Sequence, residues 1–371
     1  MNSRIFMIGI GGLAKKRPVS PVVIHFLNLG KELTKRGHRV VFMTWPKSSQ
    51  KVRDFPDVFA FPSPRPTRIK DLWFALKRIK EEKPDAILAN FGSVNVLMLA
   101  GYLAKVPIRI AWYHTLNEAI RLDAKRPPWQ ISLLNFRKML IYRLCTHLVP
   151  VSSAGALDLT TIYHIPSSRI HILHNSMPDP LKQFKFSFVR DTNTIVCVGR
   201  LDICKGQDVL IKGISLLHHK YPDLVVKFIG AGPMKTKYQK LADELGVQDH
   251  CHFLGELPHD EVLKHLARST ISVVPSRSDN FPTTVIESLS VGTPVIASNT
   301  GGIPDIFQHN KEGLLVPPGD PQALAHSIDI MLSHEELRLK MGEHARQRFL
   351  NAFESSKVIP KQADYLEHLV L

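Results

Sequence analysis

Apolar, β-branched runs alternate with amphipathic stretches along the whole chain, and both halves follow this order. Each apolar run predicts a buried strand of a parallel sheet, and each amphipathic stretch predicts a helix that crosses from one strand to the next. In the first half the predicted strands are RIFMIGI, HRVVFMTW, DAILANF, RIAWYH, HLVPVS and RIHILHN. The second half begins afresh with TIVCVGR, DLVVKFIGAG, CHFLGEL, TISVVPS, PVIAS and GLLVPPG.

The pattern predicts an α/β protein of two tandem doubly wound (Rossmann-like) domains. At 371 residues the chain exceeds the ~250 to 300 at which one hydrophobic core stops growing. Residues 178–192 carry proline and charge instead of periodicity, so we place the linker there. The expected domains are 1–185 and 190–351, with a C-terminal helix 352–371 that packs back on the first domain. Ligands of such sheets bind outside the carboxyl ends of the strands, so the interdomain cleft is the expected site.

Composition excludes several classes of protein. A hydrophobic content of 44% and a charged content of 22% are ordinary for globular proteins and exclude a disordered chain. The four cysteines show no CxxC spacing, which favours reduced, buried thiols over a metal site. No run reaches the ~18 apolar residues of a membrane span, and the first residues do not resemble a signal peptide. We expect a cytoplasmic protein, at most peripheral on the inner face of the membrane.

The positive charge belongs to one half of the chain. Residues 1–190 contain 30 Lys and Arg against 11 Asp and Glu, a net charge of +19, whereas residues 191–371 carry 18 against 22. Such an imbalance attracts anionic partners, namely phosphates, acidic lipids or nucleic acid, although a merely solubilising surface is the alternative. Because sequence-reading helices and aromatic stacking motifs are absent, we do not expect a nucleic-acid partner.

The first glycine cluster, GIGGLA from Gly9 to Ala14, matches a dinucleotide-binding fingerprint only weakly. A nicotinamide or flavin site needs an acid near the end of the second strand, but none occurs between Glu32 and Asp54. The following KKRPVSP also prevents a tight helix start. We interpret the loop with Gly11 and Gly12 either as a ligand contact facing the cleft or as simple turn chemistry.

Two cations and two acids mark the second half. In VGRLDICKGQDVL, Arg200 and Lys205 lie on a strand-to-helix loop, where they either neutralise a diphosphate or are solvated. In SDNFPTTVIESLSVG, Pro282 predicts that Asp279 lies in the loop and Glu287 inside the helix. Phosphates favour the mouth of such a helix, whereas carboxylates repel them and suit neutral hydroxyls. A nucleotide sugar contains both diphosphate and hydroxyls.

With these motifs in order, the chain resembles the retaining glycosyltransferases of family four, which have the GT-B fold. The resemblance covers nearly the whole length and is densest over residues 195–330. Besides the segments quoted above, it rests on PDAILANF, AWYHT, VPVSSAGALDL, IHILHNSMPD, FIGAGP, FLGELPHDEV, GGIPDI and GLLVPPGDPQALAHSI.

The resemblance implies a role for each candidate residue of the second half. The family's E-x7-E motif is present as D-x7-E, with Glu287 expected on the ribose hydroxyls and Asp279 on the donor sugar. Asp in place of the first Glu shortens the reach by one methylene and leaves the sugar open. The other implied donor contacts are Arg200 and Lys205 on the diphosphate, Leu257 beside the base, and the backbone of Asn280, Phe281 and Pro282 along the sugar.

In the first half, the resemblance places His114 at the donor ring, where it positions the sugar by hydrogen bonding, and has the Gly11 and Gly12 loop close over the donor. In similar enzymes the leaving phosphate accepts the acceptor's proton, so no protein nucleophile, metal or cofactor is required beyond the nucleotide sugar as co-substrate. No DxD motif occurs in the chain.

The implied function is transfer of a sugar from a nucleotide-diphosphate sugar to a glycan or lipid-linked acceptor, in synthesis of bacterial surface polysaccharide or glycoconjugates. The basic first domain would hold the acceptor and contact an anionic membrane surface. The alternatives are a soluble acceptor, a sugar-nucleotide epimerase, a phosphorylase, or an inactive donor-binding homologue.

Overall fold

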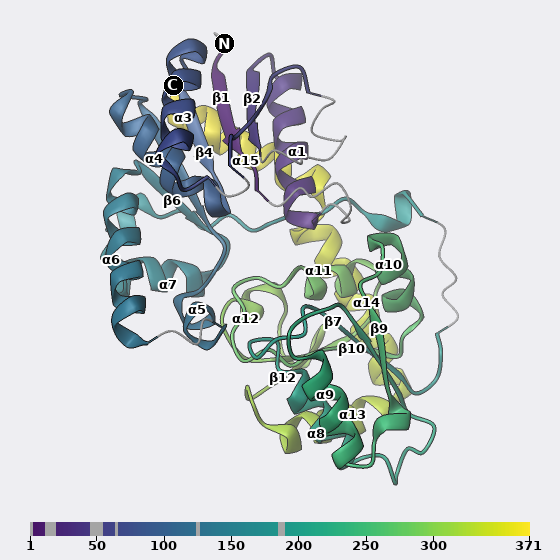
Figure 1. Ribbon diagram of the computed structural model, residues 1–371. Helices are drawn as coiled ribbons and strands as arrows, with labels where there is room; N and C mark the ends of the chain where they lie inside the picture. Colours follow the sequence, from purple (N-terminus) through teal and green to yellow (C-terminus); the bar gives the residue numbers. More distant parts are fainter. Residues whose placement is uncertain (1–2, 12–19, 45–54, 64–65, 124–126, 185–189) are drawn as a thin grey trace. The chain divides into compact units, whose positions relative to one another are not determined.

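The computed structural model describes residues 3–11, 20–44, 55–63, 66–123, 127–184 and 190–371. The chain divides into two compact units (Figure 1). The first contains residues 1–114, 126–178 and 355–371, and the second contains 115–125 and 179–354. Each unit is built on its own six-stranded sheet.

The sheet of the first unit is parallel throughout, with the strand order β3-β2-β1-β4-β5-β6. Its central strands are apolar and buried on both faces, as expected for a parallel sheet covered by helices. The strands are β1 (Ile5–Gly9), β2 (Arg39–Thr44), β3 (Val58–Ala60), β4 (Ala86–Ala89), β5 (Ile108–Tyr113) and β6 (His147–Pro150).

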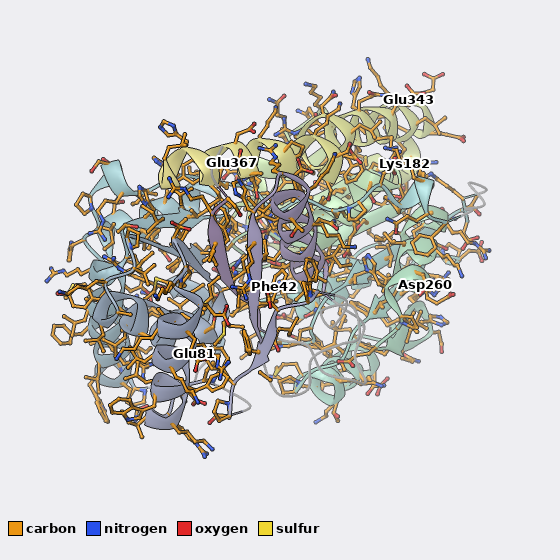
Figure 2. The ribbon with its side chains drawn as sticks, turned by 90° about the horizontal axis from the view of Figure 1, so that it is seen from above. Phe42, Glu81, Lys182, Asp260, Glu343 and Glu367 are labelled. Carbon is orange, nitrogen blue, oxygen red and sulfur yellow. The ribbon has the colours of Figure 1, made fainter. Side chains whose placement is uncertain are left out.

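Helices cover both faces of this sheet. One face carries α1 (Pro21–Lys35) and α15 (Ser355–Val370), which pack against each other, and the other carries α3 (Ile69–Glu82), α4 (Val94–Leu103) and α6 (Pro128–Leu144) (Figure 1). Seen from above, Glu367 on α15 and Glu81 on α3 lie on opposite sides of the strand that bears Phe42 (Figure 2). Helix α7 (Ser153–Thr161) follows β6. Right-handed crossovers produce this division of helices between the faces.

Charged side chains attach α15 to the first unit. Arg36 donates to Glu367 at 2.7 Å and to Asp364 at 2.6 Å, and His38 contacts the same Glu367 at 2.8 Å. The amide of Gln362 donates to the main-chain oxygen of His174 at 2.8 Å. These bonds accompany the burial of apolar residues on the inner side of α15, so the helix is an integral part of this unit.

The second unit repeats the architecture with the strand order β12-β11-β10-β7-β8-β9, again parallel throughout. Its core combines β-branched strand residues with aliphatic residues from the helices that cover them. The strands are β7 (Thr194–Val198), β8 (Val225–Ile229), β9 (Cys251–Gly255), β10 (Ile271–Val274), β11 (Val295–Ser298) and β12 (Gly313–Val316).

The helices of the second unit also form two layers (Figure 1). Helices α8 (Gln207–Ser215), α9 (Lys235–Glu244) and α13 (Pro321–Ser333) pack together on one face. Helices α10 (His259–Arg268) and α11 (Thr283–Ser290) pack on the other, where α14 (Glu335–Ala352) lies against α11. The short α12 (Ile303–Ile306) precedes β12, and α5 (Asn117–Asp123) belongs to the 115–125 segment.

The structure differs from the sequence expectations at two strands. RIHILHN is not a strand. It is joined to the neighbouring β6 only by an isolated bridge between Ile170 and Leu148 and by two further main-chain hydrogen bonds. The short β3 was not expected, because its three residues lie between Pro56 and Pro62 and give too brief a pattern.

Residues 115–125 group with the second unit, whereas the sequence expectation included them in a first domain of 1–185. The main-chain oxygen of Ala119 accepts from the Cys204 thiol at 3.4 Å. Leu116 is buried and lies close to Gly301, so local contacts account for the grouping.

All four cysteines are buried thiols, as expected for Cys197 and Cys251 from the apolar runs that contain them. Within the described ranges, no helix is both long and apolar enough to cross a membrane.

Candidate nucleotide-sugar site

The candidate residues of the second unit lie on loops at the carboxyl ends of its strands. β7 ends at Val198 and leads into the loop with Arg200 and Lys205, and β10 ends at Val274 and leads into the loop with Asp279. Helix α11 begins at Thr283, with Pro282 at its N-cap, and Glu287 lies inside it. In a parallel sheet these ends share one edge, which is where ligands of doubly wound domains bind.

Lys205 and Asp279 are in direct contact. The Lys205 ammonium donates to Asp279 Oδ2 at 2.5 Å, and the Ser276 hydroxyl donates to the same oxygen at 3.4 Å. Burial opposes the charged form of Lys205, but the Asp279 carboxylate outweighs it and raises the pKa of Lys205. The ammonium is therefore charged at neutral pH and held at the mouth of the α11 loop.

Asp202 organises the loop that carries the two cations. Its Oδ2 accepts from Arg200 Nε at 2.5 Å, and its Oδ1 accepts from the Lys205 amide at 3.1 Å. The Arg200 side chain is 60% exposed, so its guanidinium reaches into solvent. Sequence reasoning missed Asp202, although an acid between two cations in RLDICK was a usable signal.

Glu287 is a buried acid with a distant polar neighbour. Its side chain is 6% exposed, and Nδ1 of His259 lies 3.7 Å from its Oε1, too far for a hydrogen bond. Burial raises the pKa of Glu287, and the nearby His259 opposes this shift. Sequence reasoning missed His259, because LPHDEV reads as an ordinary helix start. Leu257, which lies two residues before it, is half-buried.

Glycines allow these loops to approach one another. A Cβ on Gly206 would lie 2.0 Å from the main-chain oxygen of Pro275, and one on Gly301 would lie 1.9 Å from that of Asp279. Both glycines have positive φ, which other residues rarely adopt. The amide of Gly302 donates to the main-chain oxygen of Asp279 at 3.0 Å, so this loop is also held by hydrogen bonding.

The residues between the two acids are buried in the second unit. Asn280, Phe281 and Pro282 have little exposed surface. The Phe281 ring packs edge-on against Phe353, with 6.0 Å between ring centroids. Burial of the side chains fixes the path of the backbone through this segment, which is the part expected to line the sugar.

His114 follows β5 in the first unit, at the carboxyl ends of three adjacent strands. Its Nε2 is 2.9 Å from Asn90 Oδ1, and the Asn90 amide donates to the main-chain oxygen of Gly9 at 3.2 Å. Phe91 stacks on the imidazole at 4.5 Å. Burial, assisted by His25, lowers the pKa of His114 to about 3, so the ring is neutral at physiological pH. Gly11 is buried near this edge, and Gly12 lies outside the described residues.

The structure thus brings Lys205 together with Asp279, links Arg200 to Lys205 through Asp202, and sets Glu287 beside His259. His114 and Gly11 are placed at the corresponding edge of the first unit. Within the described part of the chain, no three His, Cys, Asp or Glu side chains gather as a metal site would require.

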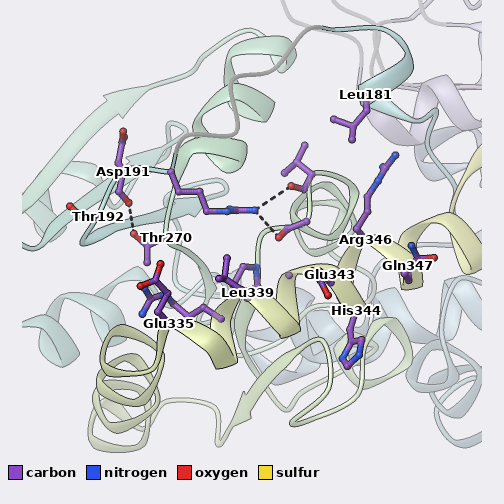
Figure 3. A pocket seen from close by; sticks show the side chains of 16 residues that line it. Leu181, Asp191, Thr192, Thr270, Glu335, Leu339, Glu343, His344, Arg346 and Gln347 are labelled. Atoms are coloured by element: carbon purple, nitrogen blue, oxygen red, sulfur yellow. Dashed lines mark hydrogen bonds between the residues drawn. The ribbon is translucent and has the colours of Figure 1, made fainter.

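A separate pocket of about 780 Å³ lies at the opposite edge of the second sheet (Figure 3). It is lined by residues that precede strands, such as Asp191 and Thr270, and by one side of α14. Arg190 in its wall donates to the main-chain oxygens of Ser269 at 2.9 Å and Gly292 at 2.8 Å, at the ends of two helices. Arg190 thus caps the C-terminal ends of two helices. None of the predicted site residues lines this pocket.

Two tandem Rossmann-like domains, each on its own parallel sheet, are the architecture of the GT-B fold. Residues 22–178 match the family described as Glycosyltransferase Family 4, and residues 179–348 match Glycosyl transferases group 1. The chain belongs to glycosyltransferase family 4.

Individual proteins agree with this assignment. D-inositol 3-phosphate glycosyltransferase from Corynebacterium glutamicum is 36% identical over 160 residues, which cover 42% of this chain and 38% of that protein. The GDP-mannose-dependent alpha-(1-6)-phosphatidylinositol monomannoside mannosyltransferase of Mycobacterium tuberculosis is 30% identical over 180 residues, 47% of each chain. The matched segments thus span less than half the length of these relatives.

The crystal structure of HepE from Anabaena in complex with UDP-glucose superposes with a TM-score of 0.80. It covers 98% of this chain and 100% of HepE at 16% sequence identity. The likeness extends over both units and establishes the shared fold.

Proposed function

We propose that the protein is a retaining glycosyltransferase that moves a sugar from a nucleoside-diphosphate sugar to a hydroxyl of a glycan or lipid-linked acceptor, without a metal ion. The observation that carries the proposal is the contact of the charged Lys205 with Asp279, in the loop before the helix that contains the buried Glu287. Lys205 supplies a cation, and Glu287 supplies an acceptor for hydroxyls.

The cations suit the diphosphate of the donor. Arg200 is exposed, and Lys205 is held against Asp279 in the loop before α11. The first backbone amides of α11 also favour anions. When the bond from the sugar carbon to the phosphate oxygen breaks, negative charge develops on that oxygen. Positive side chains at this position stabilise it, and this is the role that a divalent ion fills in other transferases.

The acids suit the hydroxyl groups of the donor. A buried carboxylate is stabilised when it accepts hydrogen bonds, and ribose hydroxyls would provide them for Glu287. Asp279 retains a second carboxylate oxygen beyond the one that Lys205 contacts, and this oxygen would accept from a hydroxyl of the donor sugar. Leu257 would meet the base, and the backbone of Asn280 to Pro282 would line the sugar.

The proposed reaction proceeds on one face of the sugar. The acceptor oxygen forms its bond to the anomeric carbon on the side from which the diphosphate leaves, and the acceptor proton passes to the departing phosphate oxygen. His114, which is neutral, would position the sugar by hydrogen bonding and would not carry the proton. The Gly11 and Gly12 loop would close over the donor.

The acceptor would belong to the basic first half and to a membrane setting. That half carries the excess of cations, which suits a phosphate-bearing acceptor or an anionic surface. The mycobacterial relative is named as a phosphatidylinositol monomannoside mannosyltransferase, and phosphatidylinositol is a lipid. We therefore place the activity in the cytoplasm, on the inner face of the membrane, in synthesis of bacterial surface polysaccharide or glycoconjugates.

Thermal denaturation with UDP, GDP, ADP and their sugars tests the donor. The panel includes UDP-glucose because the HepE structure contains it, and GDP-mannose because the mycobacterial relative is named for it. A nucleotide present at 100 times its dissociation constant should stabilise the protein by about 2.7 kcal/mol. The anomeric configuration of the product, read by NMR, tests retention. Absence of stabilisation by every nucleotide, or an inverted product, would refute the proposal.

A further inference from the structure

Helix α6 of the first unit exposes an apolar stripe on its outer side. Trp129, Leu133, Phe136 and Leu140 are 65%, 60%, 55% and 45% exposed. Their spacing of four, three and four residues places them on one face of the helix. The opposite side of α6 is also apolar and contacts the rest of the unit through the buried Ile131 and Tyr142. The stripe is therefore surplus to the packing that holds the helix in place.

The charge around the stripe has one sign. Helix α6 contains no Asp or Glu, and Arg137 and Arg143 are exposed beside the stripe. Lys138 points to the inner side, where its ammonium lies 6.0 Å from the centre of the Tyr163 ring. The outer surface of α6 thus combines apolar side chains with flanking guanidinium groups. Contiguous apolar patches of this kind mark interaction surfaces.

We propose that the outer face of α6 docks on an anionic phospholipid bilayer, with the helix lying in the plane of the interface. Tryptophan and phenylalanine insert at the boundary between headgroups and acyl chains, and arginines bind the lipid phosphates. This docking proposal rests on the proposed function in one respect, which is the expectation that the protein works near a membrane. The stripe and its charge are features of the helix itself.

A second copy of the chain fits the stripe less well. Four side chains with these exposures present on the order of 500 Å², whereas a stable dimer buries about 800 Å² on each partner. A symmetric contact through α6 would also bring the arginines of both copies together, and like charges in an interface are unfavourable. An anionic bilayer matches both the apolar area and the charge.

Co-sedimentation of the full chain with vesicles tests the proposal in the absence of any donor. The wild type should bind vesicles of phosphatidylglycerol and phosphatidylcholine in equal parts, and Leu133→Ser/Phe136→Ser should bind at least about tenfold more weakly. The matched control is Leu216→Ser/Leu339→Ser in the second unit, where both leucines are 57% exposed, and its binding should equal that of the wild type.

Two further variants separate the apolar and electrostatic contributions. Arg137→Gln/Arg143→Gln should lose most of its preference for phosphatidylglycerol and should show a smaller decline in binding as salt rises. Trp129→Phe should retain binding but lose most of the fluorescence quenching by brominated acyl chains, because the Trp129 indole lies in the bilayer in this arrangement.

Absent wild-type binding, or binding of Leu133→Ser/Phe136→Ser at wild-type level, would overturn the proposal. A wild-type dimer that this variant converts to monomer, without vesicle binding, would overturn it in favour of self-association. Nucleotide-induced thermal stabilisation of the same variant keeps the two proposals apart. If nucleotide stabilises the protein but the wild type does not bind vesicles, only the docking proposal is wrong. If the wild type binds vesicles but no nucleotide stabilises the protein, only the proposed function is wrong.

Discussion

The ammonium of Lys205 lies 2.5 Å from a carboxylate oxygen of Asp279, although 74 positions separate the two residues in the chain. The contact joins the loop after β7 to the loop before α11. It keeps the lysine charged and positioned before any donor arrives. A diphosphate that binds there has to share the ammonium with Asp279, so the two residues should respond differently to substitution.

We expect Lys205→Ala to weaken nucleoside-diphosphate binding by about 100-fold, because a charge-assisted hydrogen bond is lost and Asp279 is left to repel the phosphates. Asp279→Asn should leave this affinity within about threefold of wild type and lower turnover instead. Isothermal titration and steady-state kinetics measure the two effects. Lys220→Ala is the control, since its exposed pair with Asp329 has a similar length of 2.6 Å. Equal loss of binding in Lys205→Ala and Lys220→Ala would contradict the assignment.

Glu287→Gln should stabilise the ligand-free protein and weaken its response to nucleotide. Burial raises the pKa of Glu287, so the charged carboxylate destabilises the fold at neutral pH, and the neutral amide should raise the melting temperature, by roughly 2 °C for each kcal/mol gained. Thermal denaturation with and without the nucleotide identified in the panel measures both effects.

The pH dependence checks the cause of this effect. A carboxyl whose pKa is raised by folding contributes most stability below its unfolded value of 4.5, and the contribution declines as pH rises through the folded pKa. Glu287→Gln should therefore gain on the wild type as pH rises through that window. A constant difference across the range would show that ionisation of Glu287 is not the reason.

Two buried histidines should make the first unit sensitive to acid. Burial lowers the pKa of His25 to about 4 and that of His114 to about 3, below their usual value of 6.5. Their neutral forms support the fold above pH 6.5, and this support should be lost as pH falls below it, by roughly 1.4 kcal/mol per pH unit for each group. Urea denaturation between neutral pH and pH 4.5 measures the slope.

His25→Asn should remove about half of that slope, while His252→Asn at an exposed position should leave it unchanged. An unaltered slope in His25→Asn would assign the acid sensitivity to other groups.

Gly206→Ala should displace the loop before α8 and lower donor affinity by at least about tenfold, because its Cβ would lie 2.0 Å from the main-chain oxygen of Pro275. Gly246→Ala is a matched control, since both glycines have a φ of 67° but nothing lies within 4 Å of a Cβ at Gly246. Both variants place alanine at the same positive φ, so a greater loss in Gly206→Ala reports the contact. Equal donor affinities in the two variants would refute it.

Most of the fold could be predicted from the sequence, because strands buried on both faces read as continuous apolar runs. All six strands of the second sheet coincide with such runs. RIHILHN was wrongly predicted to be a strand, because its isoleucines and leucine alternate with histidines as in a half-buried strand. In the folded chain Ile172 is 43% exposed, and the segment lies where the sheet ends.

The site was only partly predictable. Motif order predicted Arg200, Lys205, Asp279 and Glu287, and the structure places the first three on loops after strand ends and Glu287 in the helix that follows. Asp202 was missed although it lies between the two cations in the sequence, whereas His259 was missed because its place beside Glu287 depends on how the chain folds. Pairings across dozens of residues leave no local pattern in a single sequence.

The attachment of α15 to α1 has a consequence for biosynthesis. During translation the ribosome produces every strand of the first sheet early, yet the helix that covers Arg36 and His38 emerges only after the second unit is made. The nascent first unit must therefore wait with an uncovered flank, which is open to chaperones and proteases, until α15 arrives.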